Sequence, residues 1–380
     1  MYIRKQIFEG LRNESAFLWG ARQTGKSTLL KWLFPDVLYF DLLLSSEFER
    51  FKRNPMLLVE IIQSGIPKMP VIIDEIQRLP ELLNTVHWLI VNKGIQFILS
   101  GSSPRKILSS GGNLLGGRAL RYELFPLVSA EIPDFNLDVA LNNGLLPRHY
   151  QSRQVKKLHS AYIGSYLKDE IMAEARIRNA DSFTRFLEVA AFSNGESVNY
   201  TNIAAECGVS SPTVRTYFEI LEDTLTGRFL PSFQKKPKRR IIHASKFYYF
   251  DLGLANYLLK RTRVEPGTET FGKAFEHFIF QELTAHSSYS GINYPLSYWR
   301  TSSGIEVDFI LGDHEVAIEV KSSQSVHPRH LSGLKSFSED YSAKHKIMVT
   351  NEPYPRQVDG IQLLPWKVFL ENLWSGAIIS

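Results

Sequence analysis

The chain contains the stretch Gly20-Ala21-Arg22-Gln23-Thr24-Gly25-Lys26-Ser27, which matches the pattern G-x-x-x-x-G-K-[ST] at every fixed position. The apolar run Ser15–Trp19 precedes it, and the amphipathic run Leu29–Phe34 follows it. The pattern therefore lies between a predicted strand and a predicted helix, the setting in which such a loop binds phosphate. The alternative is a glycine-rich turn without a ligand, and the strand–loop–helix setting argues against it.

This loop predicts a site for ATP together with Mg²⁺. Backbone N–H groups surround the phosphates in loops of this kind, and the positive end of the following helix adds to the attraction. We expect Lys26 to reach the β- and γ-phosphates and the Ser27 hydroxyl to bind Mg²⁺. The residues expected to contact the nucleotide are Gly20, Ala21, Arg22, Gln23, Thr24, Gly25, Lys26, Ser27 and Thr28.

A second motif, Val71-Ile72-Ile73-Asp74-Glu75, ends another apolar run in two acidic residues. A carboxylate at the end of a buried strand is costly unless it faces a cation or a strong donor. We expect Asp74 to hold Mg²⁺, directly or through water, and Glu75 to polarise the attacking water as a general base. The alternative is that the acidic pair caps a helix that starts near Leu79.

The run Ile95–Ser102 predicts a further strand that ends in polar residues. Ser100 is expected to sense the γ-phosphate or orient water, and the alternative is a plain turn residue. Arg105, Arg118 and Arg121 are candidates for an arginine that acts on the ATP of a neighbouring subunit, and we favour Arg118. The alternative for each arginine is a solvated surface charge. The predicted catalytic residues are Glu75, Lys26, Ser100 and Arg118.

Short apolar runs alternate with amphipathic stretches over residues 1–150. The runs are Ser15–Trp19, Val37–Phe40, Val71–Ile73 and Ile95–Leu99. Such alternation predicts an α/β fold with a parallel sheet that is covered by helices on both faces. For the rest of the chain we expect a helical and winged-helix domain over residues 151–260 and an α/β nuclease-like domain over residues 261–380. The loop Arg261–Thr270 is the best candidate for the linker.

Composition permits several partners and excludes few. The chain has 380 residues, enough for two or three domains, and 44 Lys and Arg against 39 Asp and Glu give a net charge of +5. This mild excess permits a nucleic-acid partner without requiring one. The single cysteine, Cys207, excludes an intrachain disulfide. Because no signal-peptide pattern and no long apolar window occur, we expect a cytoplasmic protein without a membrane partner.

Residues 201–214 have the layout of a helix–turn–helix. The first helix is expected to end at Gly208, and Ser210 or Ser211 is expected to cap the second helix. The buried stripe of the second helix is expected to be Val214, Phe218 and Leu221. The residues at its exposed start, where recognition helices touch base edges, are Ser211, Thr213, Arg215 and Thr216.

A basic segment follows, between two strand-like runs. The segment Lys235-Lys236-Pro237-Lys238-Arg239-Arg240 precedes the apolar run Phe247–Phe250, and this is the outline of a wing. Its charges would contact DNA phosphates and make binding steeply salt-dependent. The alternatives are a protein-contact or ATPase-lid domain and a merely solvated loop. The predicted nucleic-acid contacts are Arg215, Lys235, Lys236, Lys238, Arg239 and Arg240.

Two strand-like runs near the C-terminus, Glu306–Leu311 and Val316–Val320, carry a set of charged residues. Strand alternation places Glu319 and Lys321 on one face, and pairing of the two strands brings Asp308 beside Glu319. Two carboxylates can bind a divalent cation, and a lysine can help to activate water. Together with Glu276 on a preceding helix, this set is typical of the PD-(D/E)XK nuclease fold. Whether such a domain cleaves nucleic acid or only holds a partner stays open.

The order of these motifs resembles that of the AAA-type ATPases that carry a C-terminal domain known as DUF4143. The shared features include Gly116-Gly117-Arg118 ahead of the segment Leu124–Leu127. The resemblance spans most of the chain and implies an ATPase core, a winged-helix segment and a nuclease-like C-terminal fold. It also implies a homo-oligomer, a hexameric ring, since an arginine would act in trans.

We therefore expect an ATP-hydrolysing AAA+ protein that binds DNA and couples hydrolysis to DNA remodelling or translocation. One alternative is an ATP-driven switch that acts on a protein partner. The other is an ATP-gated, metal-dependent nuclease. The three hypotheses differ in what stimulates hydrolysis and in whether DNA is cut.

Overall fold

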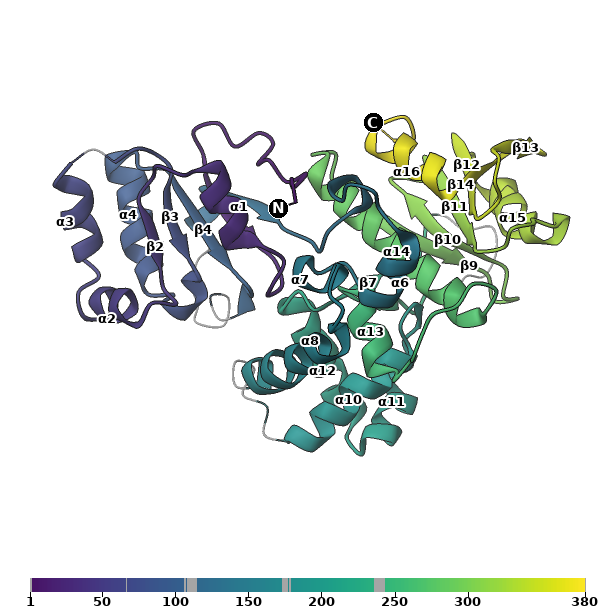
Figure 1. Cartoon of the computed structure of the whole chain (residues 1–380), viewed down its shortest axis with the longest axis horizontal. Helices are drawn as coiled ribbons and strands as arrows, with labels where there is room; N and C mark the ends of the chain where they lie inside the picture. The colour runs from purple at the N-terminus through teal and green to yellow at the C-terminus, as the bar shows by residue number, and fades with distance from the viewer. Residues whose placement is uncertain are drawn as a thin grey trace. The chain divides into compact units, whose positions relative to one another are not determined.

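The computed structural model describes residues 2–65, 67–105, 107, 115–172, 177, 179–235 and 243–379 (Figure 1). Contacts divide the chain into two compact units. The parallel-sheet unit comprises Gln6–Pro126 and the short segment Asp223–Thr226. The C-terminal unit comprises Met1–Lys5, Leu127–Glu222 and Gly227–Ser380.

The parallel-sheet unit is built on five strands in the order β2-β3-β4-β1-β5, and each neighbouring pair is parallel. The strands are β1 Ser15–Trp19, β2 Tyr39–Asp41, β3 Val71–Asp74, β4 Phe97–Gly101 and β5 Ala119–Glu123. The strands β1, β3 and β4 are buried along their whole length, as expected of central strands in a covered parallel sheet. The predicted α/β fold with a parallel sheet is confirmed.

Helices and short 3₁₀ turns connect these strands. They are α1 Lys26–Leu33, α2 Ser45–Arg53, α3 Leu57–Gln63, η1 Ile76–Arg78, α4 Leu82–Lys93 and η2 Leu115–Gly117. One hydrophobic core joins Phe17, Ile73 and Leu99 of the sheet to residues of α2, α3 and α4. The helix expected near Leu79 begins only at Leu82, because the 3₁₀ turn η1 comes first.

The C-terminal unit contains a six-stranded sheet in the order β13-β14-β12-β11-β10-β9. Its strands are β9 Leu296–Arg300, β10 Glu306–Leu311, β11 Val316–Lys321, β12 His345–Thr350, β13 Arg356–Val358 and β14 Ile361–Pro365. Its helices are α14 Glu269–Tyr289, η5 Pro328–Leu331, α15 Ser332–Asp340 and α16 Trp366–Trp374. Val316, Ile318 and Val320 pack into the core that contains α14, while Ala317 packs into the core that contains α15. The predicted alternation of β11 is therefore confirmed.

A three-stranded sheet in the order β6-β8-β7 belongs to the same unit. Its strands are β6 Glu196–Ser197, β7 Gly227–Leu230 and β8 Lys246–Tyr249, and the helices α10 Ala180–Phe192, α11 Tyr200–Cys207, α12 Ser211–Asp223 and α13 Leu252–Leu258 accompany them. α11 ends at Gly208, whose φ of 67° is the left-handed value expected of a C-terminal glycine. The Ser210 hydroxyl accepts the N–H of Thr213 at 3.3 Å, so Ser210 caps α12. Val214, Phe218 and Leu221 are buried as predicted.

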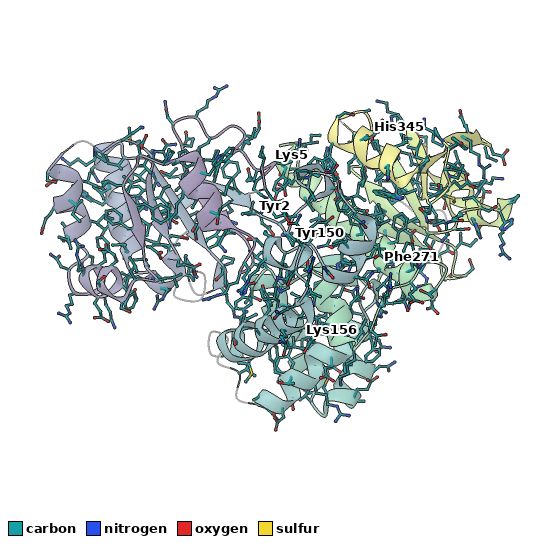
Figure 2. The ribbon with its side chains drawn as sticks, in the orientation of Figure 1. Tyr2, Lys5, Tyr150, Lys156, Phe271 and His345 are labelled. Atoms are coloured by element: carbon teal, nitrogen blue, oxygen red, sulfur yellow. The ribbon has the colours of Figure 1, made fainter. Side chains whose placement is uncertain are left out.

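Residues 127–150 pack within the C-terminal unit, so the parallel-sheet unit ends at Pro126 rather than near residue 150. The elements of residues 127–170 are η3 Ser129–Glu131, α6 Leu137–Asn143, α7 Pro147–Tyr150, α8 Val155–Ala161 and a π-helix, η4 Tyr162–Glu170. Leu141 and Tyr150 share one core with Phe271 of α14, and Tyr150 and Phe271 are labelled in Figure 2. The division at residue 260 into two further domains stays a prediction. No helix in the described ranges is long and apolar enough to cross a membrane.

Candidate functional site

The loop between β1 and α1 has a backbone shape that depends on its glycines. Gly25 immediately before α1 has φ 99°, a value that side chains disfavour. A Cβ atom on Gly20 would lie 2.5 Å from the carbonyl oxygen of Leu124, so only glycine fits there. α1 then begins at Lys26, with the N–H groups of its first turn at the end of the loop.

Lys26 lies folded back onto this loop. Its ammonium donates hydrogen bonds to the carbonyl oxygens of Gly20 at 2.7 Å and of Ala21 at 3.3 Å, and only 5% of the residue is exposed. Burial lowers the pKa of Lys26, and the nearby carboxylates of Glu75 and Asp74 oppose this shift in part. Among the described residues, the groups that accept hydrogen bonds from this cation are neutral carbonyls, so an anionic ligand would stabilise it further.

Asp74, at the end of β3, accepts hydrogen bonds from three hydroxyl groups. Its Oδ2 atom accepts hydrogen bonds from Ser27 at 2.6 Å and from Tyr39 at 2.5 Å. Its Oδ1 atom accepts one from Ser100. The structure thus brings together Ser27, Asp74 and Ser100, which the sequence singled out. The sequence analysis did not predict Tyr39. This residue lies in the neighbouring strand β2, in register with Ile72, and its position in that strand is the signal that could have indicated it.

Glu75 adopts a left-handed backbone conformation, with φ 59° and ψ 41°. Such strain in a residue other than glycine is frequent at functional sites. Its carboxylate accepts a hydrogen bond from Gln77 at 2.5 Å, and Gln77 also donates to the Ser102 hydroxyl at 3.1 Å. α4 begins at Leu82, and Glu75 makes no side-chain capping bond. The structure therefore does not support the alternative in which the acidic pair caps this helix. Gln77 is a further residue of the site that the sequence analysis did not predict.

The remaining residues predicted for this site differ in exposure. Arg105 forms an ion pair with Asp223 within the parallel-sheet unit. Arg118 and Arg121 are exposed. Gln23 and Thr28 are also exposed, whereas Arg22 and Ser27 are half-buried. Arg118 and Arg121 therefore have the accessibility that an arginine acting in trans requires, while Arg105 is already paired.

The residues around Ser27 and Asp74 fit a magnesium ion. They offer hydroxyl and carboxylate oxygens, the ligand atoms that Mg²⁺ prefers. In the described part of the chain, no group of three or more His, Cys, Asp or Glu residues is arranged to hold a metal. In nucleotide sites Mg²⁺ is commonly shared by one or two carboxylates, water and the phosphates. Ser27 and Asp74 are the residues that would hold it.

A second polar site lies in the C-terminal unit, where β10 and β11 pair with Phe309 opposite Ile318. This register brings Asp308 beside Glu319, and Asp308 accepts the N–H of Val320 at 2.8 Å. Lys321 forms an ion pair with Glu319 at 2.7 Å. The pairing of β10 with β9 is irregular between Val307 and Ile310, an irregularity that is common beside functional sites.

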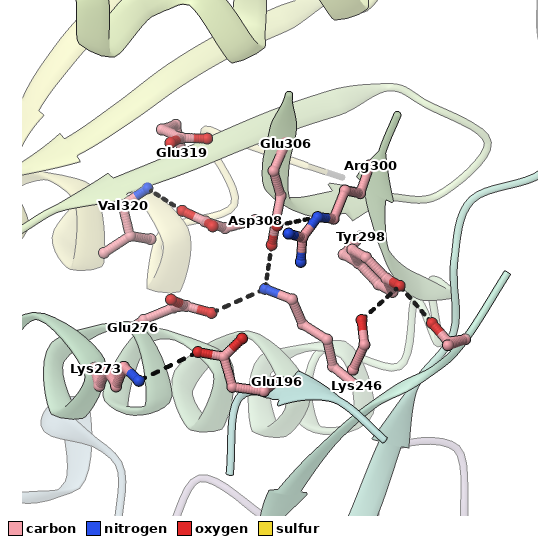
Figure 3. A network of polar contacts seen from close by, with 12 residues as sticks. Glu196, Lys246, Lys273, Glu276, Tyr298, Arg300, Glu306, Asp308, Glu319 and Val320 are labelled. Atoms are coloured by element: carbon pink, nitrogen blue, oxygen red, sulfur yellow. Dashed lines mark hydrogen bonds and ion pairs between the residues drawn. The ribbon is translucent and has the colours of Figure 1, made fainter. Parts of the chain in front are cut away.

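Lys246 of β8 enters this second site and was not predicted (Figure 3). Its ammonium contacts Glu276 of α14 at 3.3 Å and also contacts Glu306 of β10. Burial raises the pKa of Asp308 and raises the pKa of Glu319 to about 7. A buried ammonium already contacts two carboxylates of this site, Glu276 and Glu306, so the residues do not fit the divalent cation that the D…E-x-K pattern suggests. We refer to Glu276, Glu306, Asp308 and Glu319 as the acidic cluster.

The residues predicted to contact nucleic acid are only partly within the described structure. Arg215 and Thr216 are exposed on α12, and the Arg215 guanidinium lies 5.0 Å from the ring centroid of Tyr200. Lys235 forms an ion pair with Asp313 in the turn between β10 and β11. Lys236, Lys238, Arg239 and Arg240 lie outside the described residues.

Both the fold and the P-loop site define an ATP-binding, ATPase-like protein. Residues 12–132 match the family model of the AAA domain. Residues 135–265 match a domain of unknown function, DUF8612, and residues 271–369 match the domain of unknown function DUF4143. The chain is therefore an AAA-domain protein with a C-terminal DUF4143 domain, which confirms the resemblance seen in the sequence.

Comparison with other proteins adds little to this assignment. The crystal structure of the Signal Transduction ATPase with Numerous Domains (STAND) protein with a tetratricopeptide repeat sensor from Pyrococcus horikoshii is similar at 14% identity. The match covers 73% of this chain and 45% of that chain, so the present chain spans less than half of that protein. A TM-score of 0.22 is too low to show a shared fold. No curated protein matches the chain.

Proposed function

We propose that the protein hydrolyses ATP in a Mg²⁺-dependent reaction at the carboxyl ends of β1 and β3. The observation that carries this proposal is the convergence of Lys26, Ser27 and Asp74, with Glu75 as the next residue of the chain. Ligand sites of open parallel sheets lie at this edge. The matching AAA domain over residues 12–132 supports the same conclusion.

Each side chain has a role that follows from its contacts. Lys26 would exchange the carbonyl oxygens of Gly20 and Ala21 for phosphate oxygens, which carry more negative charge. Ser27 and Asp74 would hold Mg²⁺, which neutralises charge on the phosphates when it is bound. Tyr39 and Ser100 hold the Asp74 carboxylate in one orientation.

Glu75 is the proposed general base. Its hydrogen bond from Gln77 holds the carboxylate in one orientation. The left-handed backbone conformation of Glu75 fixes the direction of its Cα–Cβ bond. A carboxylate in this position would take a proton from the attacking water. Arg118, exposed after η2, is the proposed arginine that acts on the ATP of a neighbouring copy, in a homo-oligomeric ring of six chains.

We further propose that hydrolysis is coupled to the remodelling of DNA or to translocation on it. The support is the arrangement of α11 and α12, with Ser210 as the cap and with Arg215 and Thr216 exposed at the start of α12. Recognition helices present their first turns to DNA in this way. The basic segment that begins at Lys235 would add phosphate contacts.

A second candidate function is an ATP-driven switch that acts on a protein partner. Two observations favour it. Lys235 is already paired with Asp313, and the exposed side of α12 carries the acidic residues Glu219 and Glu222. Acidic side chains repel DNA phosphates, whereas they suit a protein surface of opposite charge. Metal-dependent cleavage is the weakest candidate, because Lys246 already contacts Glu276, one of the carboxylates predicted for the metal site.

Steady-state hydrolysis of ATP by the purified protein tests these proposals. The assay compares no DNA with duplex, single-stranded and branched DNA, and Lys26→Ala serves as the blank. Stimulation by one form of DNA, lost in Arg215→Ala and at high salt, would support the remodelling function. Hydrolysis that is indifferent to every form of DNA would favour the protein-directed switch. Hydrolysis equal to that of Lys26→Ala would contradict the ATPase proposal itself.

A further inference from the structure

Lys246 joins three separate elements of the C-terminal unit. It is the first residue of β8, and only 3% of it is exposed. Its ammonium contacts Glu276 of α14 and Glu306 of β10 (Figure 3). The ring of Tyr298 on β9 lies with its centroid 5.2 Å from the same ammonium, a cation–π contact. The lysine therefore connects the three-stranded sheet to α14 and to the six-stranded sheet.

Basic side chains of the described residues contact the acidic cluster around Lys246. The acidic cluster supplies four carboxylates, and in the described part of the chain three cations contact them, namely Lys246, Arg300 and Lys321. Among these described residues, one carboxylate is in excess of the cations. Burial, together with the neighbouring charges of Glu319 and Glu276, raises the pKa of Asp308 well above its usual value.

Two carboxylates of the acidic cluster, Glu276 and Asp308, also accept hydrogen bonds. The Tyr248 hydroxyl donates to Glu276 Oε1 at 2.6 Å, and the N–H of Val320 donates to Asp308 Oδ2 at 2.8 Å. A divalent cation requires about six oxygen ligands whose lone pairs are free to face it. Such an ion would have to displace the lysine and compete with these donors. The displaced ammonium would lose its partners in a buried position, which is costly.

We propose that Lys246 is a built-in cation, which takes the place of a divalent metal in the acidic cluster and fastens the three-stranded sheet to the six-stranded sheet. The cluster then acts as a metal-free ion-pair latch and not as a cleavage centre. One atom, Glu319 Oε2, indicates where a metal would bind once Lys246 is removed. Glu319 Oε2 is buried and has no hydrogen-bond partner within the described ranges. The test of this proposal needs no nucleotide, so its outcome does not depend on the proposed ATPase function.

Lys246→Met tests the latch, since methionine keeps the length of the side chain and removes its charge. In buffer free of divalent cations we expect the Tm of the C-terminal unit to fall by roughly 10 °C, because the carboxylates are left with one cation fewer. Added Mn²⁺ should restore most of this loss in the variant and leave the Tm of the wild-type protein unchanged. Electron paramagnetic resonance of free Mn²⁺ should count one more bound ion in the variant than in the wild type.

Two variants serve as controls. Lys335→Met removes a half-exposed lysine that pairs with Asp359 at 2.6 Å, and it should behave like the wild type in both measurements. Lys246→Met combined with Asp308→Asn should lose the rescue by Mn²⁺. The proposal is overturned if Lys246→Met melts at the wild-type Tm. It is also overturned if the wild-type protein binds Mn²⁺ and Asp308→Asn alone abolishes that binding. The second comparison holds even where Lys246→Met does not fold.

Discussion

Two buried lysines, Lys26 in the P-loop and Lys246 in the acidic cluster, lie close to carboxylates and differ in how their charges are matched. Lys26 donates to the carbonyl oxygens of its own loop, and burial lowers its pKa. Lys246 contacts two carboxylates directly, and the surrounding negative groups raise its pKa well above the usual value in spite of its burial. In the described part of the chain, the hydrogen bonds of Lys26 go to neutral carbonyl oxygens, whereas Lys246 is in direct contact with two carboxylates.

This difference shows how a buried lysine at a ligand site can be distinguished from a structural one. A buried cation whose hydrogen bonds go to neutral acceptors gains free energy when an anion binds. A buried cation that is surrounded by carboxylates gains nothing further, and its removal leaves unmatched negative charge. We therefore expect the two lysines to respond in opposite ways to substitution, with activity lost at one and stability lost at the other.

The largest effect is expected for Lys26→Ala. Without its ammonium the phosphates of ATP lose their main charged contact, and hydrolysis should fall by about 10²–10³-fold. The stabilisation of the parallel-sheet unit by MgATP, measured as a shift in Tm, should disappear as well. Lys246→Met should leave hydrolysis within about twofold of the wild type, because its partners belong to the acidic cluster. Equal losses of activity in Lys26→Ala and Lys246→Met would contradict the different roles assigned to the two lysines.

Glu75→Gln should separate binding of ATP from its hydrolysis. The amide keeps the shape of the side chain but cannot take a proton from water, so the rate should fall by about 10²–10⁴-fold. The shift in Tm produced by MgATP should remain, since Lys26 is unchanged. Glu81→Gln, at an exposed position just before α4, is the matched control and should keep the wild-type rate. A Glu75→Gln protein with wild-type hydrolysis would remove Glu75 from its proposed role.

Tyr39→Phe is expected to have a smaller effect on the same site. It removes one of the hydroxyl groups that orient Asp74, and the concentration of Mg²⁺ needed for half-maximal hydrolysis should rise by about tenfold. Titration of Mg²⁺ at saturating ATP measures this change. Tyr354→Phe, at a highly exposed tyrosine, should leave the titration unchanged. An unchanged Mg²⁺ requirement in Tyr39→Phe would show that Ser27 and Ser100 suffice to orient the carboxylate.

The smallest effect concerns the pH dependence of stability in the acidic cluster. Burial raises the pKa of Glu319 to about 7, and Lys321 opposes this in part. The fold therefore favours the protonated carboxyl group. The stability that this preference provides is present below the ordinary pKa of glutamate, near 4.5, and is lost as the pH rises to about 7. For Glu319 alone this loss is about 3 kcal/mol.

Glu319→Gln should remove that part of the pH dependence, which thermal unfolding between pH 4 and pH 8 measures. Buried histidines act in the opposite direction. The pKa of His277 is lowered by burial to about 4, so its contribution to stability rises with pH between about 4 and 6.5. The difference between Glu319→Gln and the wild type isolates the glutamate. Glu371→Gln, at an exposed position on α16, should follow the wild-type curve. A curve for Glu319→Gln that is parallel to that of the wild type would contradict the assignment.

Local sequence determined the nucleotide site to a large extent. The eight residues of the P-loop are contiguous, and Asp74 ends a strand whose apolar run is visible in the sequence. The helix–turn–helix was predictable for the same reason, since Gly208, Ser210 and the spacing of Val214, Phe218 and Leu221 act within one or two turns of helix. These features depend on the backbone geometry of neighbouring residues, which short patterns describe well.

Tertiary structure alone decided which charges are matched. Tyr39 reaches Asp74 only because β2 pairs with β3, and Lys246 reaches Glu276 and Glu306 only because β8 packs beside α14 and β10. In the sequence the motif of Asp308, Glu319 and Lys321 reads as a metal site, and nothing near Lys246 in the chain links it to that motif. The free energy of a buried charge depends on every group within a few ångströms. The three-dimensional packing of residues far apart in the chain therefore fixes it, and a local pattern does not.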